Sequence, residues 1–150
     1  MTMCERTNFL DLPAEQSDFA SARYVVLPVP FEQTVSYKSG TAGGPAAIIE
    51  ASAQVELLDE EFLAEFVACG IATLDAVTPT PTASGDWPVL YPGVRDVMAA
   101  GKFLLALGGE HSITAPLVRA AREVHGPVSV LQIDAHADLR HEWLGAQHSH

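Results

Sequence analysis

The sequence predicts an α/β fold of three layers, in which helices cover both faces of a mostly parallel sheet. Short, continuous apolar runs alternate with segments of helical character, and glycine or proline lies at several of the junctions between them. Strands that are apolar along their whole length are typical of parallel sheets, because helices cover both of their faces. We therefore expect successive strand–helix–strand units that form a single domain.

The first part of the chain contains few clear elements. Residues 1–22 are polar and irregular, and they predict an N-terminal surface arm. Residues 24–29 form a β-branched apolar run that predicts a buried strand. After a loop, Pro45 predicts the start of a helix, because proline suits the first helical position. Residues 55–66 mix apolar and acidic side chains, so strand and helix remain open there.

The remaining elements follow from apolar runs and from the residues that break them. Residues 71–74 predict a short strand, and the Pro- and Thr-rich stretch 78–88 predicts a loop. The later elements are expected to be a helix at 94–100, a buried strand at 102–107, an amphipathic helix at 113–124 and a second buried strand at 128–133.

Composition limits the classes of partner. Eight basic and nineteen acidic residues give the 150-residue chain a net charge of −11, which argues against nucleic acid and permits cationic substrates or metal ions. The two cysteines are isolated in the sequence and fit a reducing compartment. We find no signal peptide and no apolar run of about 20 residues, the length that a membrane span needs. A cytoplasmic location is therefore expected.

Polar side chains follow the last two predicted strands. Gly108-Gly109-Glu110-His111-Ser112 follows one strand, and Asp134-Ala135-His136-Ala137-Asp138 follows the other. Ligands of open α/β sheets collect beyond the carboxyl ends of the strands. Alternate residues of an extended segment point to the same side, so Asp134, His136 and Asp138 can converge. Carboxylates and imidazole suit manganese, although zinc or iron would also accept them.

Simpler interpretations of the same residues stay open. The Asp-x-His-x-Asp run could be no more than polar surface. His111 could lie at a helix cap, and Ser112 could be a capping hydroxyl for the helix that follows. The occurrence of two such clusters after successive strands favours a metal site.

The two clusters resemble the first and second signatures of the ureohydrolase (arginase/agmatinase) family. Residues 30–37, 43–48 and 147–150 are similar to agmatinase segments, so the resemblance covers about residues 22 to 150. It implies that residues 23–150 are the N-terminal part of one ureohydrolase domain. Glu110 stands where aspartate is commoner in the family. The third family signature, which supplies two more carboxylate ligands, is absent, because the chain contains no Asp-x-Asp.

The resemblance also implies a mechanism. His111 and Asp138 would hold one Mn2+ ion, His136 would hold a second, and Asp134 would bridge the two. A metal-bridging hydroxide would attack the guanidinium carbon, and Asp138 would orient it. His150 is the candidate proton shuttle to the leaving amine, with His148 and His141 as competitors.

The substrate that the resemblance favours is agmatine, which would give putrescine and urea in polyamine biosynthesis. Arginase, guanidinobutyrase and formimidoylglutamase activities remain alternatives, and full-length relatives are expected to be homo-oligomers. Without the third signature, the 150-residue chain is expected to be inactive and poorly soluble alone. A non-catalytic metal-binding protein is the other possibility. A nucleotide-binding domain is disfavoured, because no Gly-x-Gly-x-x-Gly follows the first strand.

Overall fold

The computed structural model describes residues 8–82, 84–142 and 145. In chain order, with η marking 3-10 helices, the helices and strands are η1 (Phe9–Asp11), α1 (Ala14–Ser17), β1 (Tyr24–Val29), η2 (Thr41–Gly43), α2 (Gly44–Ser52), β2 (Leu58–Asp59), β3 (Ala64–Glu65), η3 (Phe66–Cys69), β4 (Ile71–Thr73), α3 (Leu90–Ala99), β5 (Phe103–Gly108), η4 (His111–Ile113) and α4 (Thr114–His125).

A parallel sheet of three strands forms the centre of the described chain, in the order β4-β1-β5. Strand β1 lies in the middle and has the bounds expected from its apolar run. Its first residue, Tyr24, lies opposite Ile71 of β4 and Phe103 of β5. Five of the six β1 residues are buried, as expected for a strand that is covered on both faces.

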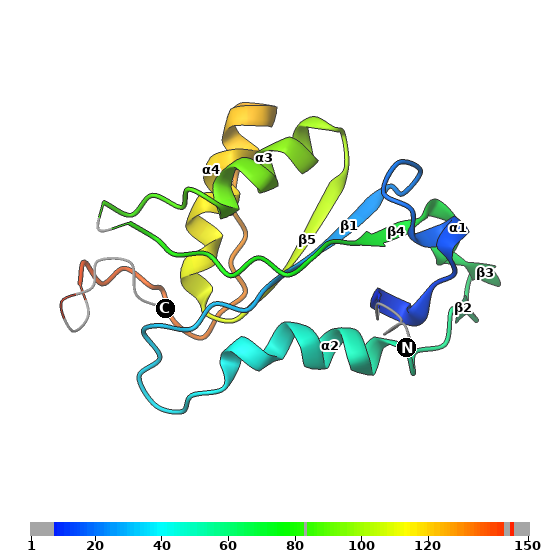
Figure 1. The fold of residues 1–150 in the computed structure, drawn as a ribbon, viewed down its shortest axis with the longest axis horizontal. Helices are drawn as coiled ribbons and strands as arrows, with labels where there is room; N and C mark the ends of the chain where they lie inside the picture. The colour runs from blue at the N-terminus through cyan, green and yellow to red at the C-terminus, as the bar shows by residue number, and fades with distance from the viewer. Residues whose placement is uncertain (1–7, 83, 143–144, 146–150) are drawn as a thin grey trace, which may run out of the picture.

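Helices cover the two faces of this sheet (Figure 1). Helices α3 and α4 pack against each other on one face, and α2 lies along the other. In α3 the buried residues Leu90, Val94 and Val97 share one side of the helix. Helix α3 begins earlier than expected, because Pro92 lies in its first turn, where a missing N–H leaves no hydrogen bond unmade. The predicted three-layer α/β architecture is confirmed.

The core is divided between the two faces of β1. Leu27 and Val29 pack with Trp87, Leu90 and Val94 towards α3 and α4. On the opposite face, Val26 belongs to a cluster with Leu10, Leu12, Val67 and Ile71. The expected surface arm therefore differs from the structure: its two leucines are buried, and each contributes about 1.5–3 kcal/mol through burial.

The segment 55–66, which the sequence left open, forms the short antiparallel pair of β2 and β3. The prediction of a buried strand at 128–133 is wrong. These residues form neither strand nor helix, and the side chains of Leu131 and Ile133 are 86% and 93% exposed. A strand requires a neighbouring backbone with which to pair, and in the described chain the outer edge of β5 carries none.

None of the helices in the described residues has the length and apolar character that crossing a bilayer requires.

Candidate metal centre

Three of the predicted site residues meet beyond the carboxyl ends of the strands. His111 begins η4 and is separated from β5 by Gly109 and Glu110, whereas Asp134 and Asp138 lie after α4 in a segment that is neither helix nor strand. His111 Nδ1 is 3.8 Å from Asp134 Oδ2, and His111 Nε2 is 3.5 Å from Asp138 Oδ2. One ligand atom from each of the three residues lies within 4.8 Å of the other two, so these residues could hold a metal ion.

His136 lies beside this group of three. Its Nδ1 is 3.5 Å from Asp134 Oδ1, but its side chain is 83% exposed. The two carboxylate oxygens of Asp134 therefore face different imidazoles, since Oδ2 lies nearer His111. The structure thus places His136 next to Asp134, outside the compact group that His111, Asp134 and Asp138 form.

Hydrogen bonds hold Asp134 in its ionised form. The backbone N–H of His136 donates to Asp134 Oδ1 at 2.8 Å, and this bond is the largest influence that lowers the pKa of Asp134. Desolvation, the second-largest influence, raises the pKa, whereas a hydrogen bond from Gln132 and the charges of His111 and His136 lower it further. An ionised carboxylate is the form that binds a cation.

Gln132 is a member of the site that the sequence reasoning missed. Its Nε2 donates to Asp138 Oδ2 at 3.0 Å and to the carbonyl oxygen of His136 at 3.4 Å. The signal was available: the alternation that groups Asp134, His136 and Asp138 includes Gln132 one step earlier. Asp138 has a φ of 50°, in the left-handed region that aspartate tolerates better than most residues.

Gly109, the second of the two glycines before His111, is required by a close backbone approach. A Cβ atom on Gly109 would lie 1.9 Å from the carbonyl oxygen of Phe31, and one on Gly108 would lie 2.8 Å from Cδ1 of Ile113. No side chain fits at Gly109 unless the backbone moves. The backbone can therefore follow this path from β5 to His111 only if residue 109 is glycine.

The capping interpretation of this segment is wrong. Ser112 is buried, and its hydroxyl makes no hydrogen bond within the described part of the chain. Ile113 lies at the N-cap of α4, and no side chain caps this helix. His125 ends α4, as expected for a residue before Gly126-Pro127.

Other candidates are placed differently. His150, the expected proton shuttle, and His148 lie outside the described residues. His141 is described and exposed.

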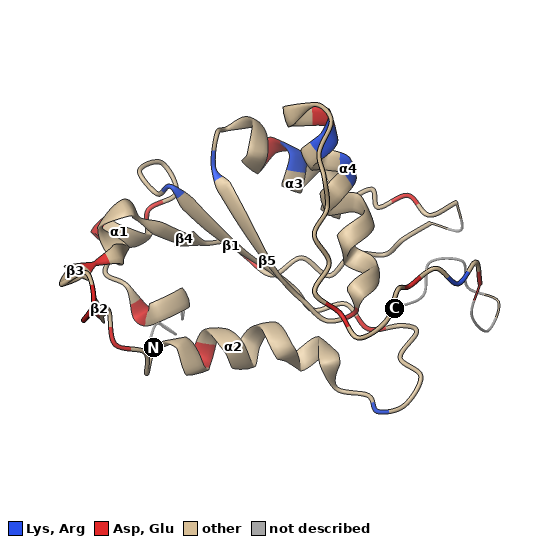
Figure 2. Cartoon of the chain, turned by 180° about the vertical axis from the view of Figure 1, so that it is seen from behind, with Lys and Arg blue, Asp and Glu red and all other residues tan. Residues whose placement is uncertain are grey.

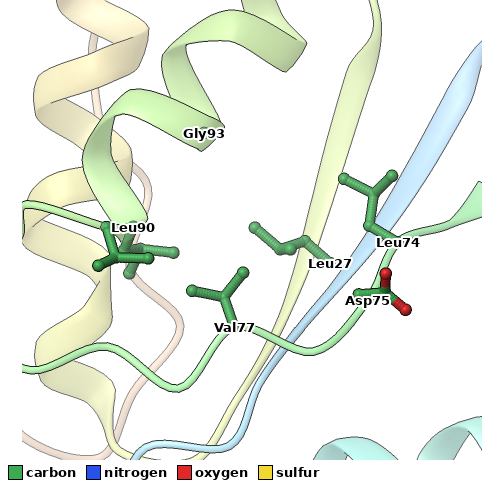
Figure 3. A pocket seen from close by; sticks show the side chains of 7 residues that line it. Leu27, Leu74, Asp75, Val77, Leu90 and Gly93 are labelled. Carbon is green, nitrogen blue, oxygen red and sulfur yellow. The ribbon is translucent and has the colours of Figure 1, made fainter.

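The described chain also contains an apolar pocket of about 280 Å3, lined by Leu27, Leu74, Asp75, Val77, Val89, Leu90 and Gly93 (Figure 3). None of the metal-ligand candidates lines this pocket.

The donor set fits a divalent cation such as manganese. Carboxylate oxygens and neutral imidazole nitrogens are the ligands that manganese accepts, and Asp134, Asp138 and His111 supply both kinds. Acidic segments also lie near the carboxyl ends of β1 and β5, whereas several basic segments lie on α3 and α4 (Figure 2). This distribution of charge favours cations at the site.

Comparison with known proteins identifies the family. A model of the arginase family matches residues 22–150. The chain belongs to the arginase family. It is 40% identical over 141 residues to an N(1)-aminopropylagmatine ureohydrolase of Thermus thermophilus, and the match covers 91% of this chain and 47% of that protein. It is 32% identical over 137 residues to the agmatinase of Bacillus anthracis, covering 88% of this chain and 46% of that protein.

A solved structure supports the same assignment. The agmatine ureohydrolase of Thermoplasma volcanium is 30% identical to this arginase-family chain, with a TM-score of 0.73 over 89% of this chain and 45% of that one. The chain spans about half the length of the curated relatives that it matches. The predicted resemblance to ureohydrolases and the arginase-like fold are therefore confirmed for the shared half.

Proposed function

We propose that this arginase-family chain provides one half of the active site of a ureohydrolase. The substrate would be agmatine or its N(1)-aminopropyl derivative, and hydrolysis of the guanidino group would release urea and an amine. The observation that carries the proposal is the meeting of His111, Asp134 and Asp138 at the carboxyl edge of the sheet. The relatives named for ureohydrolase activity on agmatine and aminopropylagmatine support this choice of substrate.

We infer that the cations are two manganese ions. His111 and Asp138 would hold one, His136 the other, and Asp134 would bridge them. The approach of a different imidazole to each oxygen of Asp134 supports the bridging role. The cations would supply Lewis-acid activation of a water molecule, which lets water attack near neutral pH.

The protein groups around this centre have separate tasks. The amide of Gln132 donates to Asp138 Oδ2 and so orients this carboxylate, which would accept a hydrogen bond from the attacking water. The acidic edge attracts a guanidinium substrate, which carries a positive charge. His150 is our candidate for the group that protonates the leaving amine, because histidine titrates close to neutral pH.

The 150-residue chain is proposed to be inactive by itself. Among the described residues the compact ligand group has only three members, and two-metal centres need more ligands than that. With agmatine as substrate the product amine is putrescine, which would place the protein in polyamine biosynthesis in the cytoplasm. Its full-length relatives would be homo-oligomers. The alternative is a non-catalytic metal-binding protein.

A chimera tests the activity. Residues 1–150 are fused to the second half of the Thermus enzyme, and urea release is measured with Mn2+ and either agmatine or N(1)-aminopropylagmatine. We expect turnover by the chimera, its loss in the D138N variant, and its retention in the control variant H125A, in which an exposed histidine at the end of α4 is removed. A folded, Mn2+-loaded chimera that releases no urea from either substrate would contradict the assignment.

The 150-residue chain is assayed in parallel. Turnover by this chain alone, at the rate of a full-length relative, would contradict the proposal that it is inactive. Tight binding of two Mn2+ ions without turnover would instead favour the metal-binding alternative.

A further inference from the structure

Glu110 is a buried carboxylate beside the metal centre. Its side chain is 3% exposed, and it precedes His111 in the chain. The carboxylate accepts hydrogen bonds from the backbone N–H groups of Gln33 and Thr34, and from the Thr34 hydroxyl at 2.7 Å. These donors belong to the loop between β1 and α2. Glu110 therefore joins two segments that are far apart in the sequence.

Backbone contacts strengthen this junction. The N–H of Glu110 donates to the carbonyl oxygen of Phe31 at 2.9 Å, at the start of the loop. The Thr41 hydroxyl donates to the carbonyl oxygen of Gly109 at 3.3 Å, at the end of the loop. Both ends of residues 31–42 are thus attached to the turn that leads into His111.

A second carboxylate draws the loop together. Glu32 accepts hydrogen bonds from the N–H of Gly40, at 2.9 and 3.0 Å, and from the N–H of Ala42 at 2.9 Å. Between these anchors, residues 36–40 are exposed, and Tyr37 is almost fully so. The tip of the loop buries no apolar side chain, so its order depends on polar anchors.

The burial of Glu110 links the two segments energetically. A buried carboxylate is costly unless hydrogen bonds compensate it, and the loop supplies the donors. When the loop leaves its place, Glu110 loses those donors and must move towards water. His111 is the next residue, so movement of Glu110 also displaces this metal-ligand candidate. Conversely, a cation that holds His111 in place would restrain Glu110 and, through its hydrogen bonds, the loop.

We propose that Glu110 is a positioning residue that couples the order of residues 31–42 to cation binding at His111, Asp134 and Asp138. The proposal rests on the proposed function, in that a divalent cation binds at this centre. Coupling of this kind is reciprocal: the cation orders the loop, and the ordered loop strengthens cation binding by the same factor. In the complete enzyme the loop would then form an ordered wall beside the reacting group only when the centre is loaded.

The test uses the 150-residue chain with Mn2+ alone. Hydrogen exchange of peptides covering residues 31–42 reports the order of the loop, and titration calorimetry reports Mn2+ affinity. The variants are E110A, E110Q and T34V, with E56A as a matched control that removes an exposed glutamate elsewhere. E110Q keeps an oxygen that can accept both backbone N–H groups, and T34V removes one donor without altering the carboxylate.

We expect Mn2+ to slow loop exchange in the unaltered chain. E110A should speed loop exchange by about tenfold and weaken Mn2+ binding by about tenfold. T34V should change both quantities in the same direction but less. E110Q should keep both within about threefold of the unaltered chain. E56A should change neither quantity. Thermal unfolding of each variant separates these effects from a general loss of stability, and T34V carries the test if E110A does not fold.

Two results would overturn the coupling while leaving the metal site intact. One is a loop that exchanges faster in E110A while Mn2+ affinity is unchanged. The other is a loop whose exchange does not respond to Mn2+ in the unaltered chain although Mn2+ binds. A chain that binds no Mn2+ would overturn the metal centre itself, and the coupling with it.

Discussion

Substitution of Gly109 by alanine should be one of the most damaging single-methyl changes in the molecule. The new Cβ would lie 1.9 Å from the carbonyl oxygen of Phe31 and 2.8 Å from its carbonyl carbon. Both atoms are backbone, so no change of rotamer relieves the clash. Overpacking costs about 1–3 kcal/mol, and we expect the upper end, about 3 kcal/mol, because the loop must shift. At about 2–4 °C per kcal/mol for a chain of this size, the melting temperature should fall by roughly 6–12 °C.

Thermal unfolding followed by circular dichroism measures this effect, and Gly93 provides the control. Gly93 lies in α3, and a Cβ added there would meet no heavy atom within 4 Å. G93A should therefore stabilise the protein by about 0.5–1 kcal/mol, because alanine forms helix better than glycine. If G109A melted within about 2 °C of the unaltered protein, or if both variants shifted in the same direction, the close-approach argument would be refuted.

Two further predictions concern the metal-binding segment. The pKa of Asp134 is lowered in the folded protein, so the stability that its ionised form contributes is present above the ordinary pKa of 3.8 and is lost as the pH falls through the lowered value. The free energy of unfolding, measured with urea at several pH values, should therefore differ between D134N and the unaltered chain by an amount that is constant near neutrality and shrinks in acid. A difference that grew in acid would contradict the lowered pKa of Asp134. I133K should reduce concentration-dependent association in sedimentation velocity, because Ile133 is an exposed apolar side chain. Y37K, which alters an exposed aromatic residue of another loop, should have little effect on association. Equal effects of the two substitutions would argue against residues 128–133 as the surface through which the chain associates.

The parts of the fold that sequence predicted well are those in which one local pattern suffices. The apolar run at 24–29 forms β1 with those bounds, because it is buried whichever strands lie beside it. The run at 128–133 has the same character, yet it forms no strand. Strand formation depends on a partner backbone, and hydrophobicity alone does not show whether that partner is present. Helix α3 begins several residues before the predicted start. A proline such as Pro92 can lie inside the first turn of a helix or before it, and the sequence does not show which.

In the candidate site, too, sequence predicts the residues that a local pattern groups and misses those that depend on distant partners. His111, Asp134 and Asp138 were predicted from residue type and spacing, and the structure brings them together. In the sequence Glu110 only stands where aspartate is commoner in the family, but in the structure it is buried and joins the loop to the site. Its role depends on donors at Gln33 and Thr34, far away in the sequence, and no local pattern shows that such a charge is compensated. Burial of Leu10 does not follow from its local sequence, because the partners in its cluster, Val26, Val67 and Ile71, lie far away along the chain.

The position of β1 in the middle of the sheet has a consequence for synthesis. Its two neighbours are β4 and β5, and both come later in the chain, with β5 ending at Gly108. A ribosome therefore releases the central strand before either neighbour has been made, and a nascent chain that does not yet contain β4 exposes this apolar strand unpaired. Chaperone capture during translation should accordingly concentrate on residues 24–29 and decline once β5 has emerged.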